Sequence, residues 1–218
     1  MSKSVVRNLI LGGALLFSLP SFALTAAGAQ SLKQLQSRWA EINYQLPAAQ
    51  REAAFAALAG EAEAALKSEP QAPELLIWRG IILSTWAGAK GGLGALDLVK
   101  QARGQFEQAI QLDAKALDGS AYTSLGSLYY QVPGWPVSFG DDQRAEQLLK
   151  QALSLNPDGI DPNYFYGDFL LREKRYAEAK VALEKALAAA PRPGREVADA
   201  GRRQEVQALL GKVQAALD

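Results

Sequence analysis

The sequence predicts an all-α protein in which helical hairpins stack into a solenoid of about three to four repeats with a C-terminal capping helix. Small residues recur at matching places with large apolar residues around them, as at Gly126 and Gly167. Apolar positions are spaced three and four apart, and no segment alternates as a strand does. Hydrophobic residues make up 49% of the 218 residues, enough for the core of one domain.

The composition excludes several classes of function. There is no His and no Cys, so a Ser-His-Asp triad, a thiol nucleophile and the usual zinc sites are impossible. The 23 Lys and Arg residues balance 23 Asp and Glu residues. Because nucleic-acid binding depends on an excess of Lys and Arg, we expect no nucleic-acid partner. We also expect no cofactor, no metal site and no catalytic residues.

Residues 1–23 are predicted to be a secretory signal peptide. Lys3 and Arg7 precede an apolar run over residues 9–19, which is the order of a signal peptide. A membrane anchor is the alternative, but a run of this length at about 1.5 Å per residue is too short for a hydrocarbon core of about 30 Å. The sequence therefore predicts a periplasmic protein with no integral membrane span after cleavage.

Two stretches of small residues are candidate sites at which a signal peptidase could cleave the chain. The preferred site is after Ala23, in Ser21-Phe22-Ala23, and the second choice is after Ala29. Cleavage at the first site leaves a mature chain without sulfur.

The clearest repeat covers residues 160–193, IDPNYFYGDFLLREKRYAEAKVALEKALAAAPRP, and it resembles a 34-residue tetratricopeptide repeat. Gly167, Ala179 and Ala186 would let two antiparallel helices approach closely. Pro191 prevents the second helix from continuing. The segment therefore predicts one complete helical hairpin, with Asp161 as the expected cap of its first helix.

Less regular units surround this repeat and divide the chain. Residues 24–72 read as a degenerate N-terminal helical repeat, and residues 73–193 as repeats with enlarged turns between their helices. Residues 194–218 carry apolar side chains on one side and polar ones on the other, which is typical of a capping helix.

The enlarged turns are two insertions, residues 84–98 and residues 129–142. The first is rich in Gly, but Lys90 precedes the last glycines, which contradicts a phosphate-binding loop. Two interpretations of this segment stay open: a flexible insert, or a loop that folds over the concave groove of the solenoid and contributes to binding. The second contains Trp135 and Phe139, which would either cover a neighbouring helix pair or contact a ligand or partner.

Two charged groups invite a functional interpretation, and both have a simpler one. Asp141 and Asp142 could form a catalytic pair, yet Asp141 is placed to cap the helix that follows. The arginines near the C-terminus alternate with carboxylates, so we interpret them as a solvated face: Arg192, Arg195, Arg202 and Arg203.

The concave face of a tetratricopeptide solenoid is lined by the first helices of its hairpins, and this resemblance gives most of the candidate binding residues. Together with the aromatic residues of the second insertion, they are Ile77, Ile81, Thr85, Thr123, Ser127, Tyr130, Trp135, Phe139, Tyr164, Asp168 and Arg172. Among these, Arg172 is cationic and has Asp168 four residues earlier as an expected ion-pair partner. The surface is apolar, aromatic and hydroxylic, which favours an apolar or neutral ligand or a partner helix.

A narrower resemblance covers roughly residues 73–194. The stretches STWAGAKGGLGALDLVKQA, GSAYTSLGSLYYQVPGWPVSFGDDQRAEQLLKQAL and PDGIDPNYFYGDFLL resemble the TatT family, the T component of tripartite ATP-independent periplasmic (TRAP) transporters. The resemblance implies a non-enzymatic partner of a periplasmic substrate-binding protein, which holds a small apolar ligand and forms homo-oligomers. Many members are lipoproteins, whereas this chain has no Cys to acylate.

Two other functions stay open from the sequence. One is an envelope-assembly scaffold that holds peptide segments of its partners. The other is a carboxylate-dependent hydrolase of cell-wall material, which would depend on Asp141 and Asp142.

Overall fold

The computed structural model of the protein describes residues 24–218, and the predicted signal peptide, residues 1–23, lies outside the described residues. Nine α-helices make up most of the described chain, which contains no β-strand. In chain order they are α1 (Ala26–Tyr44), α2 (Ala48–Ser68), α3 (Pro73–Lys90), α4 (Ala95–Leu112), α5 (Ala116–Gln131), α6 (Asp142–Leu155), α7 (Ile160–Arg172), α8 (Tyr176–Ala188) and α9 (Glu196–Leu217).

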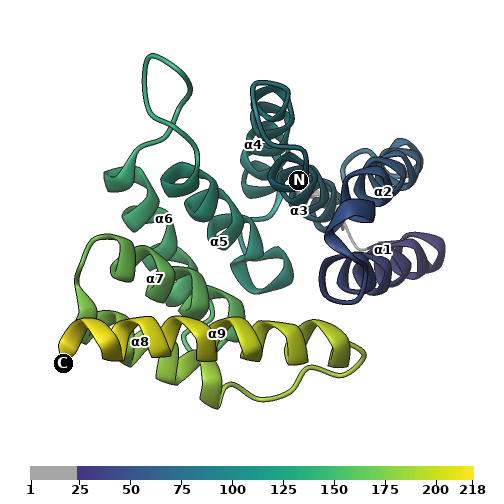
Figure 1. The fold of residues 1–218 in the computed structure, drawn as a ribbon. Coiled ribbons are helices and arrows are strands. Elements are labelled where there is room, and N and C mark those ends of the chain that lie inside the picture. The colour runs from purple at the N-terminus through teal and green to yellow at the C-terminus, as the bar shows by residue number, and fades with distance from the viewer. Residues whose placement is uncertain (1–23) are drawn as a thin grey trace, which may run out of the picture.

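Successive helices pair into four hairpins, α1 with α2, α3 with α4, α5 with α6, and α7 with α8. Neighbouring hairpins stack on one another, and α9 follows the last (Figure 1). The predicted all-α solenoid of helical hairpins with a C-terminal capping helix is confirmed.

Close approach of the two helices in a hairpin depends on Gly in the first of them. A Cβ added to Gly80 of α3 would lie 2.5 Å from Cε1 of Phe106 in α4. A Cβ added to Gly167 of α7 would lie 2.6 Å from Cγ of Leu183 in α8. Because both distances are shorter than atoms tolerate, a large side chain of the second helix occupies the space that Gly leaves.

The apolar core divides between the two halves of the solenoid. One large cluster draws mainly on α1 to α5, with one buried residue each from α6 and α9, and includes Phe55, Leu75, Ile82, Phe106 and Leu125. A second draws on α5 to α9 and includes Leu149, Phe169, Leu170, Leu183 and Val206. Because Val206 belongs to α9, this helix contributes to the core and also covers the end of the solenoid.

The first insertion, residues 84–98, is mostly helical, so the expectation of a flexible insert is wrong. Helix α3 continues to Lys90, α4 begins at Ala95, and only residues 91–94 connect them. Leu98 and Val99 are buried in the core at the start of α4. Burial of these side chains extends the hairpin and outweighs the helix-breaking tendency of the glycines.

The second insertion contains an ordered turn that projects beyond the ends of α5 and α6 (Figure 1). Its two arms are joined by a backbone hydrogen bond from Gly140 N to Pro133 O, of 3.0 Å. Another, from Asp141 N to Tyr129 O, is 2.9 Å long. These bonds fix where the tip of the turn lies relative to the hairpin.

The two expected Asp caps have different outcomes. Asp141 is the N-cap of α6, and its carboxylate accepts a hydrogen bond from Arg144 N, which confirms the capping interpretation. At α7 the N-cap is Gly159, and Asp161 lies inside the first turn, so the prediction for Asp161 is wrong. Its carboxylate is directed to two arginines of the C-terminal segment, described below.

The beginning of α5 contains three consecutive residues in the left-handed region. The φ angles are 48° at Leu117, 55° at Asp118 and 76° at Gly119. An L-residue in this region costs about 1–2 kcal/mol relative to the right-handed helix, whereas Gly carries little steric cost there.

We therefore expect Asp118→Gly to raise the free energy of unfolding by about 0.5–1 kcal/mol, because Asp118 is exposed and its replacement removes strain without removing core contacts. Urea denaturation measures the difference. As a control, Asp142→Gly at the start of α6 should instead destabilise by about 1 kcal/mol. A destabilised Asp118→Gly variant would show that the Asp side chain supports this turn.

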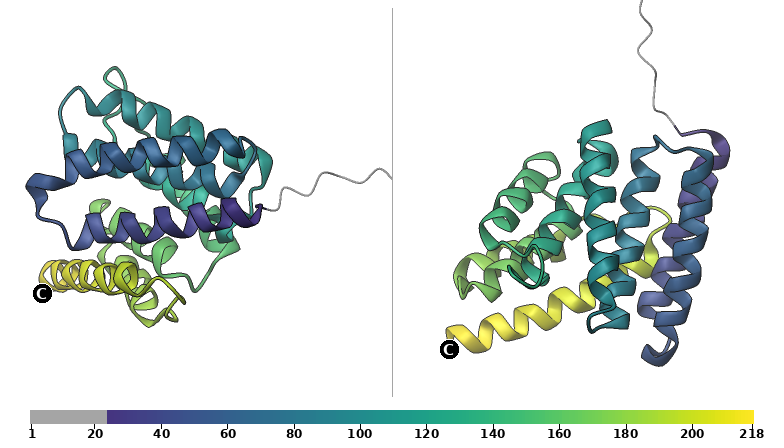
Figure 2. Two further views of the ribbon diagram at one scale, coloured as in Figure 1. Left: turned by 90° about the vertical axis from the view of Figure 1, so that its right-hand side faces the viewer. Right: turned by 90° about the horizontal axis from the view of Figure 1, so that it is seen from above.

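Helix α9 runs back along the solenoid (Figure 2) and contacts α8, α7 and α1. Gly201 of α9 lies against the ring of Tyr44 at the end of α1. The Tyr44 hydroxyl donates a hydrogen bond of 3.3 Å to Glu205. The C-terminal helix therefore joins the last hairpin to the first. Within residues 24–218, none of the helices has both the length and the apolar character that crossing a membrane requires.

Candidate functional site

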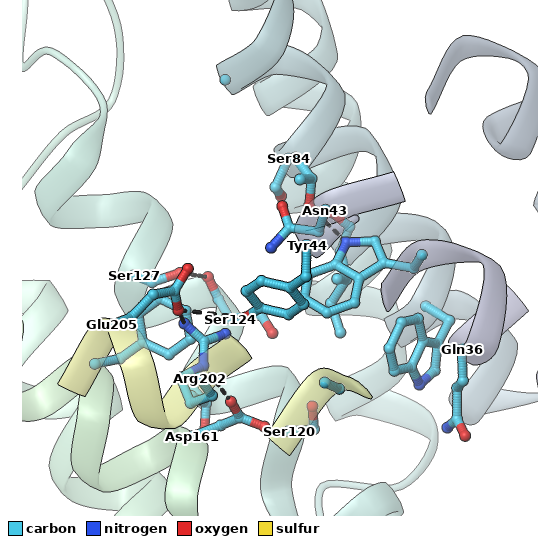
Figure 3. A pocket seen from close by; sticks show the side chains of 18 of the residues that line it. Gln36, Asn43, Tyr44, Ser84, Ser120, Ser124, Ser127, Asp161, Arg202 and Glu205 are labelled. Carbon is cyan, nitrogen blue, oxygen red and sulfur yellow. Dashed lines mark hydrogen bonds and ion pairs between the residues drawn. The ribbon is translucent and has the colours of Figure 1, made fainter. Parts of the chain in front are cut away.

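A groove of about 790 Å³ lies between the first helices of the hairpins and the segment that leads into α9. Residues from α1, α3, α5, α7 and α9 line it, with smaller contributions from α2 and α4. Its polar lining is mainly hydroxyl and amide groups, several of which are labelled in Figure 3: Gln36, Asn43, Ser84, Ser120, Ser124 and Ser127.

Aromatic rings of α1 and α3 form one wall of the groove. The ring centroid of Trp39 lies 5.8 Å from that of Trp78 and 5.8 Å from that of Tyr44, in both cases edge to face. The Trp39 indole N–H donates a hydrogen bond of 2.9 Å to Oγ1 of Thr85. Edge-to-face packing and this hydrogen bond hold the rings in fixed orientations.

Opposite charges connect α7 to the C-terminal segment at the groove (Figure 3). The Asp161 carboxylate accepts hydrogen bonds from Nη1 of Arg192, at 2.7 Å, and from Nε of Arg202, at 2.9 Å. Nη1 of Arg202 also donates to Glu205, at 2.7 Å. The Arg202 guanidinium lies over the ring of Tyr164, 4.2 Å from its centroid.

The Asp161 carboxylate at the centre of this network stays charged at neutral pH. Burial alone would raise the pKa of Asp161, but the nearby Arg202 and Arg192 guanidinium groups lower it to about 2. Burial raises the pKa of the Tyr164 hydroxyl to about 12. Neither group gains or loses a proton near neutral pH, so the cluster is suited to holding α7 against α9 and unsuited to general acid-base catalysis.

The interpretation of the C-terminal arginines as a solvated face is wrong. Arg192 and Arg202 are bound in this network, Nε of Arg195 is buried, and Arg203 donates hydrogen bonds to the carbonyls of Leu187 and Ala189. The side chain of Arg202 is 10% exposed, and that of its neighbour Asp199 is 7% exposed. Arg202 precedes the buried Val206 by one helical turn, so it lies on the face of α9 that packs against the solenoid. The spacing of four residues between Arg202 and Val206 was the feature of the sequence that could have predicted the burial of Arg202.

Four of the candidate binding residues predicted from sequence line the groove. They are Ile81, Thr85, Thr123 and Ser127, from α3 and α5. The Thr85 and Ser127 hydroxyls donate to main-chain carbonyls of their own helices, at 2.7 Å and 2.8 Å.

The other candidates on the first helices lie elsewhere. Ile77 is fully buried in the core, and Tyr164 lies beneath Arg202 at the edge of the groove. Tyr130 is buried and its hydroxyl donates to Asp168 at 2.7 Å. The expected ion pair between Asp168 and Arg172 is not formed, and the exposed Arg172 guanidinium lies 6.0 Å from the centroid of the Tyr130 ring.

Phe139 and Trp135 of the second insertion have opposite environments. Phe139 packs edge to face on Tyr129, with centroids 5.4 Å apart, and under the Arg103 guanidinium at 5.0 Å. Trp135 is 90% exposed at the tip of the turn. It neither covers a helix pair nor lines the groove.

We expect Trp135→Ala to change the free energy of unfolding by less than about 0.5 kcal/mol, since an exposed side chain loses few contacts. Phe139→Ala is the matched control on the same turn, and it should cost at least about 1 kcal/mol because Phe139 is packed. Chemical denaturation of both variants measures the contrast. A comparable loss in both would place Trp135 against the protein in solution.

Metal and carboxylate chemistry receives no support from the described part of the chain. Among residues 24–218, no group of three or more carboxylates is arranged to hold a metal ion. Asp141 and Asp142 do not line the groove.

Comparison with known proteins finds a similarity in the C-terminal part of the chain. A tetratricopeptide repeat family model matches residues 138–213, a segment that includes α6, α7 and α8 and most of α9. No curated protein matches the chain. Among solved structures, a thermophilic TPR protein of Thermus thermophilus is similar at 21% identity over 87% of this chain and 98% of that chain, with a TM-score of 0.39. Residues 138–213 are thus similar to tetratricopeptide repeats, and the helical hairpin of α7 and α8 within this segment agrees with that similarity.

Proposed function

We propose that this tetratricopeptide-repeat protein is a non-enzymatic scaffold whose groove binds a segment of a partner protein. The observation that carries the proposal is the groove itself, about 790 Å³ in volume and lined by the first helices of the hairpins and by α9. Tetratricopeptide repeats are typical of protein-binding scaffolds.

The chemistry of the groove favours a peptide segment over a small apolar molecule. Hydroxyl and amide side chains can exchange hydrogen bonds with the backbone of an extended segment, and the rings of Trp39 and Trp78 offer apolar contact beside them. Four arginines also line the groove, which makes its surface more polar than the sequence predicted. A neutral apolar ligand would offer no hydrogen-bond partner to the hydroxyl and amide groups or to the arginines that have no carboxylate, at a cost in affinity.

Photo-crosslinking tests the groove as the binding surface. A photoreactive phenylalanine analogue at Ser124, which lines the groove, should form an adduct with one segment of a partner protein in cells. The same analogue at Gln207, which is exposed on α9 outside the groove, should not form that adduct. No adduct at Ser124, or the same adduct from both positions, would contradict the proposal.

A small apolar ligand remains a second candidate because of a separate pocket. Leu153, Leu170 and Val181 contribute to a largely apolar pocket of about 510 Å³ beside α6, α7 and α8, and Val181 is 61% exposed there. The fluorescent probe N-phenylnaphthylamine should bind this pocket, and Val181→Glu should abolish its enhanced emission. Equal emission from the wild type and this variant would contradict the second candidate.

We also propose that the protein acts in the periplasm, on the strength of the signal-peptide pattern in residues 1–23. N-terminal sequencing of protein from the periplasm should then begin at Leu24. An intact Met1 in the mature pool would contradict cleavage.

On the basis of the resemblance to the TatT family, we propose a specific partner, the substrate-binding protein of a TRAP transporter. If that partner is correct, it should be the protein found in the Ser124 adduct. An adduct with an unrelated envelope protein would instead favour the assembly scaffold.

A further inference from the structure

The four arginines that line the groove differ in whether the protein supplies them with a carboxylate. Arg192 pairs with Asp161 and Asp199, and Arg202 pairs with Asp161 and Glu205. Arg51 and Arg195 form no ion pair with any residue of 24–218, so the described chain leaves two cationic groups in the groove without a counter-ion.

Arg195 is held in place although it has no acidic partner. Its guanidinium lies over the ring of Trp78, 4.8 Å from the centroid, and this contact joins the segment before α9 to α3. Its Nε atom is buried and donates no hydrogen bond within the described residues. A buried donor without an acceptor lowers stability. Arg195 also lines the groove, where an acceptor on a ligand can approach the guanidinium group.

The charges around Arg195 make an anion favourable there. Burial and the neighbouring Arg192 guanidinium lower the pKa of Arg195 below its ordinary value, so its surroundings disfavour a positive charge that has no partner. Asp161 lies nearby, but its two oxygens already accept from Arg192 and Arg202.

Arg51 adds a second cation from the start of α2. Its Nε donates a hydrogen bond of 2.9 Å to the carbonyl of Leu46, which fixes the side chain at the turn between α1 and α2. Asp118 is the one lining carboxylate outside the network, and it is exposed. The four arginines and the carboxylates of Asp118, Asp161, Asp199 and Glu205 balance in number, but Arg51 and Arg195 are the two cations that have no carboxylate within ion-pair distance among the described residues.

We propose that Arg195 and Arg51 form a carboxylate-binding subsite in the groove, which recognises Asp or Glu side chains of an acidic peptide segment. The proposal rests on the function proposed above and names the chemistry of the bound segment. The flat guanidinium fork binds a carboxylate through two parallel hydrogen bonds, and partial burial strengthens them.

The hydroxyl groups that α5 contributes to the same groove are the reason for assigning the anion to a peptide. Ser120, Ser124 and Ser127 line the groove at spacings of four and three residues, so their hydroxyls follow one face of α5 (Figure 3). A row of hydroxyls suits the alternating donors and acceptors of an extended backbone, and a small free anion would leave most of it unused.

The test measures fluorescence anisotropy of a labelled peptide of alternating Ser and Glu, with the same peptide carrying Gln in place of Glu as its neutral match. The purified protein should bind the Glu peptide roughly tenfold tighter than the Gln peptide, because charge-assisted hydrogen bonds exceed neutral ones by about that factor. Arg195→Gln should remove most of this preference, and Arg51→Gln should reduce it.

Matched variants separate recognition from folding. Arg38→Gln changes an exposed arginine of α1 outside the groove and should keep the full preference. Arg195→Lys keeps the charge without the fork, so an intermediate preference is expected. Unchanged affinity for the Gln peptide in Arg195→Gln would show that the groove is intact, and Arg51→Gln tests the subsite without disturbing the contact on Trp78.

Each other result has a defined meaning. Equal binding of the two peptides by the wild type would overturn the carboxylate subsite while leaving the peptide groove standing. A preference that survives in both Arg195→Gln and Arg51→Gln would overturn the assignment to these residues. Displacement by free glutamate at concentrations similar to those of the peptide would overturn the peptide as the source of the carboxylate. If neither peptide binds, the subsite is overturned, and the crosslink at Ser124 decides separately whether the groove binds a partner.

Discussion

Asp161→Asn should lower the free energy of unfolding by about 3 kcal/mol, because it removes the carboxylate that Arg192 and Arg202 share. Arg202 is nearly buried, and its remaining acidic partner Glu205 lies on the same helix, so the ion pairs that join α7 to α9 and the segment before it would be lost. Chemical denaturation measures the difference. The control Asp158→Asn changes an exposed carboxylate and should cost less than about 0.5 kcal/mol. Similar losses in both variants would contradict the role of the network.

The same network predicts how stability depends on pH. The pKa of Asp161 is about 2 in the folded protein, below its ordinary value of 3.8. A lowered pKa contributes stability that is complete above the unfolded value and is lost as the pH falls through the folded value. The wild type should therefore lose about 2 kcal/mol through this group between about pH 5 and pH 2. The stability of Asp161→Asn should fall less steeply over the same range.

Gly167→Leu should destabilise the protein by about 1–3 kcal/mol or more, because the new side chain would occupy the space of Leu183 in the facing helix. A Cβ alone would already lie 2.6 Å from Leu183 Cγ, and the backbone nitrogen of that residue is 3.4 Å away. The two helices of the hairpin would have to separate. Thermal and chemical denaturation both report the loss.

The control is the same substitution where space is available. A Cβ on Gly104 of α4 would meet nothing within 4 Å, and this residue is exposed. Gly104→Leu should be neutral or stabilise by up to about 1 kcal/mol through higher helix propensity. Equal stability of Gly167→Leu and the wild type would show that the close approach of α7 and α8 is not required.

The repeat architecture could be predicted because its packing depends on local residue types. A small residue opposite a large one, as at Gly167 and Leu183, identifies a helical hairpin from sequence alone. The first insertion, residues 84–98, was misassigned for the opposite reason. Its glycines argue for a loop locally, but Leu98 and Val99 are held by core contacts from distant residues, and these extend the helices.

The groove was only partly predictable, because some of its charged lining residues come from outside the helical hairpins. Thr85, Thr123 and Ser127 follow from repeat positions, and they do line it. Arg195 and Arg202 belong to the C-terminal segment, and their place in the groove depends on α9 folding back to α1. No repeat pattern encodes that path, although the position of Arg202 on the apolar face of α9 hints at its burial.

The return of α9 to α1 also bears on how such a protein can change its size. In an open solenoid each repeat touches only its neighbours, so repeats can be gained or lost at the end with little disturbance. Here α9 must reach from α8 to Tyr44 in α1, and its length matches one particular number of hairpins. Duplication or deletion of a hairpin would separate Tyr44 from Gly201 and Glu205. The closing helix thereby makes the number of repeats a fixed property of the molecule, and it couples the two ends so that they should unfold together.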